Sequence, residues 1–379
     1  MPSEVSPNVT AGSARFGRWA ERTFLIVLAL VAAFAIAAAT GARFGLLFLI
    51  GLGLGVTLEG LRFGFAGPWR AMIVNRDPSG VLAQLFAIGL VAIVAIPLIT
   101  QNGTELVGAH APVGFAMVGG AFGFGVAMQL VMGCGSGTLV NAGSGNPVGL
   151  LALPFFAIGS FMGAWHLNWW TNLGTIRVIS FDGYAGVAIT LAGLVAVSGL
   201  LLVLAAPGYR RIPRRLWIAA GLIAALAIAN LLVSGQPWGV VYGLGLWAAK
   251  GAQAIGVDLA GSTFWSAPLN AERVRETLLT DITSLTNLGL IAGAFLVAMW
   301  RHGFSQPVPK LPLQAWIAVV IAGLMLGYTS RLAFGCNVGA FFSGVSTGSL
   351  HGWVWFVFAF AGSWVGIRLR PVLGLERRK

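Results

Sequence analysis

Eleven long apolar runs constrain this chain more than any other feature of its sequence. Each run is close to the roughly 20 residues that a helix needs to cross about 30 Å of hydrocarbon. Only 9% of the 379 residues are charged, whereas an ordinary soluble domain has about 25%. We therefore predict an all-α polytopic protein with ten or eleven spans in a lipid bilayer. The runs are residues 24–40, 44–58, 81–100, 113–132, 148–165, 185–206, 217–234, 239–257, 282–300, 314–330 and 351–367.

The net charge of +12 has a topological explanation. Lys and Arg collect in the cytoplasmic loops of membrane proteins, and several basic clusters of this chain lie between apolar runs or at the C terminus. We therefore expect no nucleic-acid partner. The first run follows a polar start and precedes further spans, so we expect an uncleaved helix and not a secretory signal.

The two cysteines of the chain, Cys134 and Cys336, mark an internal duplication. Each stands in a Gly-Cys-x-x-Gly motif, and glycines on both sides of the two motifs also align when one inserted residue is allowed. Duplicated halves are common in secondary transporters. We therefore predict two tandem repeats between short tails. The units are a cytoplasmic N-terminal tail (1–23), a first repeat (24–165), a linker with one span (166–216), a second repeat (217–367) and a basic C-terminal tail (368–379).

The distribution of charge indicates that the two repeats are inverted. Eleven complete crossings from a cytoplasmic N terminus would place seven basic residues outside, against the positive-inside rule. If one segment stops short of crossing, the second half inverts and all seven face the cytoplasm. The sequence does not identify that segment. The seven residues are Arg301, Lys310, Arg368, Arg370, Arg377, Arg378 and Lys379.

Residues 132–147 are too rich in glycine for a stable lipid-exposed helix, because each interior glycine costs roughly 1 kcal/mol relative to alanine. The stretch nevertheless carries no charge and lies between two apolar runs. Irregular backbone at membrane depth is tolerated only where protein buries it or where it lines a cavity. We predict a span, a sharp turn at Gly133-Cys134-Gly135, and a re-entrant half-helix that ends near Asn146.

The same device is predicted at residues 335–337, and residues 62–70 resemble a further re-entrant turn with 262–268 as its counterpart. A half-helix that begins at mid-membrane directs unpaired N–H groups and about half a positive charge at the centre. Such an end binds anions through backbone alone, and four ends sum to about two charges. The predicted pathway residues are Gly133, Cys134, Gly135, Gly137, Asn141, Gly335, Cys336, Asn337, Gly339, Ser343, Arg62, Phe63, Gly64 and Phe65.

The two thiols have a structural and a functional interpretation. A buried free cysteine often serves as a small hydrophobe. The equivalent positions of Cys134 and Cys336 in the two repeats, each at a predicted helix N terminus, favour a function instead. A thiol offers a weak S–H donor and a polarisable surface, which suits a sulfur-bearing anion. Because a thiolate would repel an anion, we expect the protonated thiol to be the working form.

The paired Gly-Cys-x-x-Gly turns in a duplicated, glycine-rich membrane chain resemble the YeeE/YedE family of sulfur-compound transporters. The resemblance covers roughly residues 44–165 and 239–367. It implies uptake of a small anion across the inner membrane, with thiosulfate as the first candidate. It also implies an hourglass fold with Cys134 and Cys336 as central thiols, and a soluble sulfur-relay partner of the TusA kind.

One position departs from the family pattern. Thiosulfate-importing relatives tend to have a third cysteine in an Arg-Phe-Cys-Phe turn, where this chain has Gly64. The departure leaves a selenium compound or another sulfur oxyanion open as the substrate. A membrane sulfurtransferase that forms a persulfide on Cys134 or Cys336, and a channel or scaffold subunit, are the alternatives from other classes. We expect a transporter and not an enzyme.

Four polar residues are further candidates for function. Glu59 and Lys250 lie near the ends of apolar runs at similar places in the two halves. Either is a candidate for coupling, because charges inside membranes are usually functional, or for snorkelling to the interface. Asn141 and Ser343 align and could line the path or cap half-helices. The scattered histidines predict no metal site, and no cofactor is expected.

Overall fold

The computed structural model describes the backbone of residues 8–209, 211–301, 303–304 and 306–376, and their side chains from residue 22 onward. Within these residues, ten helical segments are long and apolar enough to cross a membrane. The chain is therefore a multi-pass helical membrane protein, which confirms the predicted class.

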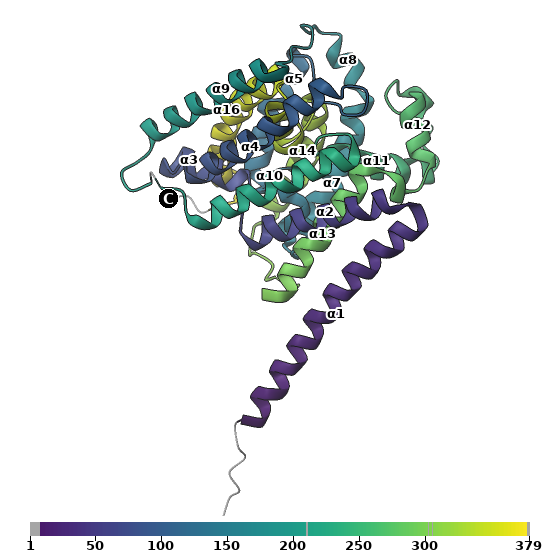
Figure 1. The fold of residues 1–379 in the computed structure, drawn as a ribbon, viewed down its shortest axis with the longest axis vertical. Helices are drawn as coiled ribbons and strands as arrows, with labels where there is room; N and C mark the ends of the chain where they lie inside the picture. Colours follow the sequence, from purple (N-terminus) through teal and green to yellow (C-terminus); the bar gives the residue numbers. More distant parts are fainter. Residues whose placement is uncertain (1–7, 210, 302, 305, 377–379) are drawn as a thin grey trace, which may run out of the picture.

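The helices alternate between long segments and short ones that lie between them (Figure 1). The long helices are α1 (Asn8–Thr40), α2 (Ala42–Gly60), α4 (Ser79–Gln101), α5 (Phe115–Val131), α7 (Pro147–Trp165), α9 (Gly183–Leu204), α10 (Arg214–Ser234), α13 (Ile282–Arg301), α14 (Leu313–Leu332) and α16 (Leu350–Val372). The short elements are α3 (Ala66–Asn75), α6 (Gly135–Gly143), α8 (Leu167–Thr171), α11 (Val241–Ala254), α12 (Pro268–Arg275), α15 (Ser343–Ser346), the 3₁₀ turns η1 (Leu259–Gly261) and η2 (Leu278–Thr280), and the π-helix η3 (Asn337–Phe342).

One predicted run is too short to cross. The run 239–257 forms α11, which has only 14 residues and a length of about 21 Å at 1.5 Å per residue. It is absent from the ten candidate spans among the described residues. The other ten predicted runs each overlap a candidate span, and the runs 113–132 and 185–206 extend two residues beyond theirs.

Helix α1 lies apart from the rest of the bundle and projects from it in Figure 1. It begins at Asn8, inside the predicted N-terminal tail, of which residues 1–7 lie outside the described residues. The guanidinium of Arg22 donates to the carbonyl of Trp300 at 2.9 Å and stacks on its ring. At the other end of the chain, α16 continues to Val372, past the predicted start of the basic tail, and residues 377–379 lie outside the described part.

Three helix pairs make the closest packing in the bundle, and each joins one half of the chain to the other: α2 with α13, α5 with α16, and α7 with α14. Glycines allow this approach because they let two helix backbones touch. A methyl group on Gly125 of α5 would collide with the carbonyl of Ala359 in α16, and one on Gly327 of α14 would collide with that of Phe156 in α7. The glycines therefore fix how the two halves interlock.

Candidate functional site

The first cysteine turn separates α5 from α6. Met132 adopts a left-handed conformation with φ of 57°, which reverses the chain after α5. Cys134 is then extended and forms the N-cap of α6, with its sulfur accepting a hydrogen bond from the Gly137 N–H at 3.4 Å. Asn146 caps α7 through the N–H of Val148 at 3.0 Å. A short helix thus begins at the predicted turn, and it ends at Gly143, three residues before the predicted break at Asn146.

The second cysteine turn begins with the same backbone conformation. Phe334 is also left-handed with φ of 57°, and Gly335 has φ of 152°. Cys336 is extended like Cys134, but the helix that it precedes is the π-helix η3. The amide of Asn337 is fully buried, and neither its nitrogen nor its oxygen has a hydrogen-bond partner among the described residues. Short π-helical turns often mark functional sites.

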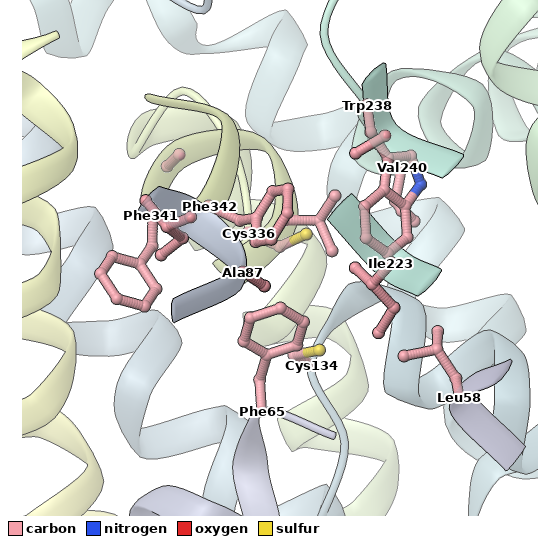
Figure 2. Packing of buried hydrophobic residues seen from close by; sticks show 14 of the residues in the cluster. Leu58, Phe65, Ala87, Cys134, Ile223, Trp238, Val240, Cys336, Phe341 and Phe342 are labelled. Carbon is pink, nitrogen blue, oxygen red and sulfur yellow. The ribbon is translucent and has the colours of Figure 1, made fainter. Parts of the chain in front are cut away.

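The two turns meet at the centre of the protein. A methyl group on Gly135 would lie 2.7 Å from the Cys336 sulfur and 3.4 Å from a methyl of Val240. Both cysteines are fully buried and free. Figure 2 shows them in one hydrophobic cluster with Phe65, Trp238 and Phe342.

Three rings of that cluster form what we call the aromatic layer: Phe65, Phe342 and Trp238. The ring of Phe342 lies between the other two, with centroid distances of 6.5 Å to Phe65 and 5.9 Å to Trp238, both edge to face. Edge-to-face contacts are a favoured arrangement for aromatic rings. The layer therefore closes the centre of the bundle with apolar surface.

A first cavity, of about 590 Å³, reaches the first cysteine turn. Its walls come from the end of α2, the turn before α3, α6 and the segment after α13. Nine of the ten predicted site residues in the first half line it, and Gly135 does not. They are Glu59, Arg62, Phe63, Gly64, Phe65, Gly133, Cys134, Gly137 and Asn141, together with Met132 and Ser136, which were not predicted.

A second cavity, of about 400 Å³, reaches the second cysteine turn. Of the predicted residues, Gly335 and Gly339 line it. Its polar wall was missed by the sequence reasoning and consists of His110, Tyr242, Arg331 and His351. The guanidinium of Arg331 lies 4.5 Å from the centre of the Phe264 ring, and no carboxylate belongs to the described lining.

The two cavities lie at opposite ends of the same helices. Helix α7 follows Asn146 in the first cavity and ends just before Leu167 in the second. Helix α13 begins beside Thr283 in the second cavity, and the segment that follows its end supplies Gln306 to the first. With 20 residues, α13 is about 30 Å long. The aromatic layer and the two thiols therefore lie between two cavities that open toward opposite sides.

Buried glutamines hold the turn at residues 62–65. The side chain of Gln84 donates to the carbonyl of Gly64 at 2.8 Å and accepts from the indole N–H of Trp69 at 3.0 Å. Gln129 donates to the carbonyl of Ala66 at 3.2 Å. Both glutamines are fully buried, and buried amides are costly unless they are hydrogen-bonded. Their role is to fix the wall of the first cavity.

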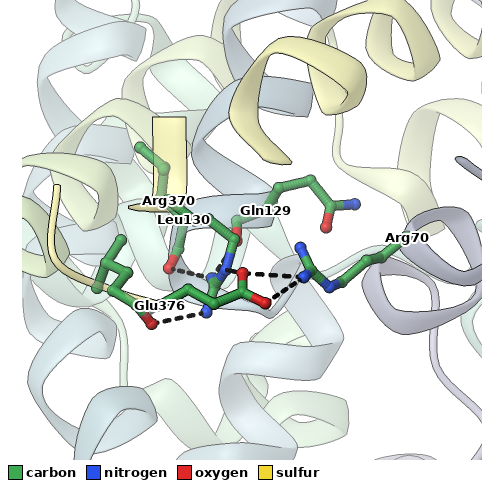
Figure 3. A network of polar contacts seen from close by, with 6 residues as sticks. Arg70, Gln129, Leu130, Arg370 and Glu376 are labelled. Atoms are coloured by element: carbon green, nitrogen blue, oxygen red, sulfur yellow. Dashed lines mark hydrogen bonds and ion pairs between the residues drawn. The ribbon is translucent and has the colours of Figure 1, made fainter. Parts of the chain in front are cut away.

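An ion-pair network beside this turn connects α3 to the C-terminal segment (Figure 3). Arg70 pairs with Glu376 at 2.7 Å, and Arg370 pairs with the same carboxylate at 3.3 Å. Arg370 also donates to the carbonyls of Gln129 and Leu130 at 2.6 and 3.1 Å. A cation at the C-terminal end of α5 satisfies carbonyls that lack helical partners.

Three buried side chains hold the corresponding loop at the second cavity. Ser343 donates to the carbonyl of Trp238 at 2.7 Å, Asn287 to that of Val240 at 2.9 Å, and Ser160 to that of Val241 at 3.0 Å. Ser343 therefore positions this loop and lines neither cavity. The segment 262–268, the predicted counterpart of the first turn, supplies only Phe264 to the second cavity.

Lys250 lies away from both cavities. Its ammonium donates to the carbonyl of Val274 at 2.7 Å and to that of Glu276. Burial lowers the pKa of Lys250, while the carboxylates of Asp281 and Glu276 act in the opposite direction. These contacts fix the end of α12, in a part of the protein that does not touch the cysteine turns.

A sequence signal for the second loop did exist. Phe63-Gly64-Phe65 precedes α3, and Trp238-Gly239-Val240 precedes α11 with the same order of a large apolar residue, glycine and an apolar residue. The histidines and Arg331 carried no such signal, because they come from segments far apart in the chain. Among the described residues, no three His, Cys, Asp or Glu side chains form a metal-binding group.

A bundle of membrane-crossing helices with two cavities that approach one buried layer from opposite ends has the architecture of a membrane transport protein. Residues 61–365 match the family described as sulphur transport, so the chain belongs to that family. This confirms the predicted YeeE/YedE membership and makes the protein a sulfur-compound transporter.

Two named relatives agree with this assignment. The chain is 26% identical over 337 residues to the thiosulfate transporter TsuA of Spirochaeta thermophila, covering 83% of this chain and 96% of the relative. It is 29% identical over 151 residues to the probable transporter YedE of Salmonella typhimurium, covering 40% of this chain and 36% of that protein. YedE of Escherichia coli matches with the same identity and coverage.

Proposed function

We propose that this chain imports a small sulfur-containing anion, with thiosulfate as the first candidate. The anion passes through a central pathway lined by half-helix N termini and two thiols. In this proposal residues 24–165 and 217–367 are inverted repeats, and α6 and η3 are the re-entrant half-helices. The matching φ of 57° at Met132 and Phe334 and of 78° at Gly145 and Gly348 supports the duplication. The reciprocal pairs α5 with α16 and α7 with α14 support it as well.

One observation carries the proposal: the two cavities at opposite ends of α7 and α13 both reach a cysteine turn. The sulfur of Cys134 lines the first cavity, and that of Cys336 lies against Gly135 immediately behind it. An anion that leaves the second cavity therefore has one thin layer to cross. Hydrophobic constrictions of this kind exclude water when closed, so the aromatic layer acts as the gate.

Arginines and backbone N–H groups along the path favour an anion. Arg62 lines the first cavity together with Glu59, and Arg331 lines the second without a carboxylate. Gly137 directs its N–H at the sulfur of Cys134. The sulfur also lies 3.4 Å from the hydroxyl of Ser136, and either group can donate to the other. When the hydroxyl donates, the S–H is able to donate to a passing anion. A protonated thiol thus replaces part of the hydration shell that the ion loses.

Basic residues assign the first cavity to the cytoplasm. Arg62, Arg70, Arg301 and Arg370 lie at this end of the bundle, and positive residues concentrate on the cytoplasmic side. The protein would then sit in the inner membrane, with the second cavity open to the outside. A TusA-like sulfur-relay protein would collect the anion at the mouth of the first cavity.

The short helix α11 is the segment that would not cross. Its 14 residues would leave ten crossings. Ten crossings would give the second half the inverted orientation, with the charges after α13 and α16 in the cytoplasm. The observation thus supplies the incomplete segment that the charge distribution requires.

Counterflow tests the proposal with the fewest assumptions. Liposomes that contain the purified full chain and unlabelled thiosulfate should accumulate external ³⁵S-thiosulfate well above protein-free liposomes. Sulfite, sulfate, selenite and selenosulfate as competitors rank the substrates. If none of these anions is exchanged, the proposed function is wrong. A persulfide on either cysteine that turns over without exchange would favour the sulfurtransferase alternative.

A further inference from the structure

Two histidines in the wall of the second cavity have no role in the pathway described so far. His110 lies in the loop between α4 and α5, and His351 lies in the first turn of α16. They reach one cavity from segments more than 200 residues apart in sequence. Imidazole is the side chain whose ordinary titration range falls between pH 5 and 8.

His351 is buried with one ring nitrogen unsatisfied. Only 1% of the residue is exposed, and its Nδ1 lies 2.7 Å from the hydroxyl of Ser349. Its Nε2 is buried and has no hydrogen-bond partner among the described residues. Buried polar atoms are nearly always partnered, so this nitrogen is placed to bind something that the cavity admits.

His110 is held against the segment that precedes His351. Its Nε2 lies 2.9 Å from the carbonyl of Thr347, which can only accept, so Nε2 carries a proton. The hydroxyl of Thr347 also accepts from the N–H of Ala109 at 3.0 Å.

The segment that carries His351 and contacts His110 adjoins the second cysteine turn. Thr347, Ser349 and His351 follow directly after η3 and α15, which begin at Asn337. A methyl group on Gly344 would lie 2.8 Å from the ring of His351. The ring of His351 therefore lies against the segment that directly follows Phe342 of the aromatic layer.

The second cavity has fewer positive charges than a bound dianion requires. Arg331 supplies one positive charge and no carboxylate lines the cavity, so a dianion there retains one uncompensated negative charge. Three described titratable groups share the cavity wall with His351: His110, Tyr242 and Arg331. A fourth, Asp182, lies on the segment whose Phe181 N–H donates to the carbonyl of Gly348. The carboxylate of Asp182 accepts a hydrogen bond from the hydroxyl of Ser180.

We propose that His110 and His351 form a proton-binding pair, so that the sulfur anion enters the second cavity together with at least one proton. This inference rests on the proposed function and adds the source of energy. Import of an anion is opposed by an interior-negative membrane potential, and each accompanying proton removes one unit of that opposing charge. Protonation at the outer face and anion binding then reinforce one another.

Proton-coupled uptake into liposomes tests the pair. Liposomes with the full chain and an internal pH dye receive ³⁵S-thiosulfate with and without an inward proton gradient. We expect the gradient to raise the initial rate severalfold and uptake to acidify the interior. Lowering the external pH from 7 to 6 should lower KM about threefold to tenfold, since one bound proton changes an equilibrium by up to tenfold per pH unit.

The variants His110→Gln and His351→Gln should reduce the ratio of rates with and without the gradient to about one. If the His351→Gln variant folds poorly, the same ratio of rates is measured in His351→Asn. The control is His166→Gln, because His166 is exposed, contacts Tyr328 and lines neither cavity. This control should retain the wild-type ratio.

The outcomes separate the two proposals. A wild-type ratio of one, in liposomes that perform thiosulfate counterflow, overturns the proton inference and leaves the proposed function intact. A raised ratio that persists in both histidine variants also overturns it, because the protons then bind elsewhere. Absence of counterflow for every sulfur and selenium anion overturns the proposed function itself.

Discussion

The two cysteine turns begin alike and then diverge. Met132 and Phe334 have the same left-handed conformation, and Cys134 and Cys336 are both extended at the start of a helix. After the first cysteine the chain forms a regular α-helix whose N–H binds the sulfur. After the second it forms a π-helix.

The residue after each cysteine explains much of this difference. Gly135 leaves space that the sulfur of Cys336 occupies, whereas Asn337 brings a buried amide without partners. As a result Cys134 faces the first cavity and Cys336 is enclosed between the two turns. Both cysteines are fully buried, but only Cys134 borders a cavity, and we expect the two thiols to act in sequence on the passing anion.

Removal of either thiol should have the largest effect. Cys134→Ala and Cys336→Ala should each abolish measurable uptake, a loss of about a hundredfold, because a hydrogen bond to a charged group contributes about 1.5–3 kcal/mol. The initial rate of thiosulfate uptake measures it, normalised to protein in the membrane. Unimpaired transport in either variant would show that the thiols only pack.

A methyl group between the turns should have the next largest effect. Gly135→Ala places a carbon 2.7 Å from the sulfur of Cys336, and overpacking costs typically 1–3 kcal/mol. We expect uptake to fall about tenfold. Gly119→Ala on α5 is the matched control, because no atom lies within 4 Å of its added carbon. Equal rates in the two variants would contradict the close approach of the turns.

Thiol labelling should separate the two cysteines directly. In single-cysteine variants, Cys134 should react with a bulky membrane-impermeant maleimide at least about tenfold faster than Cys336, and from the cytoplasmic side. The reason is that only Cys134 lines the first cavity. Inside-out and right-side-out vesicles provide the comparison. Faster labelling of Cys336 would contradict the placement of Cys134 at the first cavity.

A third thiol should have the smallest effect. A side chain at Gly64 would meet no atom within 4 Å and would face the first cavity, so Gly64→Cys should fold normally. We expect thiosulfate uptake to rise about twofold to fivefold relative to selenium anions, since one weak donor is added. A shift toward selenium compounds would favour that branch of the family as the source of the substrate.

Much of the architecture was predictable. The apolar runs located the spans, and the glycines around Cys134 located α6 with its ends at Gly135 and Gly143. The incomplete segment was not predictable, because the run 239–257 has an ordinary apolar composition and only its helix boundaries reveal the short α11. The aromatic layer was missed for a related reason: in a membrane chain an aromatic residue carries no signal of whether it faces lipid or the pathway.

The polar wall of the second cavity was missed because its members are isolated in sequence. His110, Arg331 and His351 have no shared spacing, and only the packing of α5, α14 and α16 brings them to one place. Gln84 and Gln129 likewise gave no signal, although the folded protein uses both to hold the turn around Gly64.

The sequence by itself determined that this protein crosses a membrane many times and that two glycine-cysteine turns interrupt its helices. Both properties follow from local chemistry, since apolar length decides whether a helix can span lipid and glycine decides where a helix can end. The tertiary structure alone decided which thiol faces a cavity, which rings close the path and which histidines share a wall. Those properties depend on contacts between segments far apart in the chain, and only the interlocking of the two halves sets them.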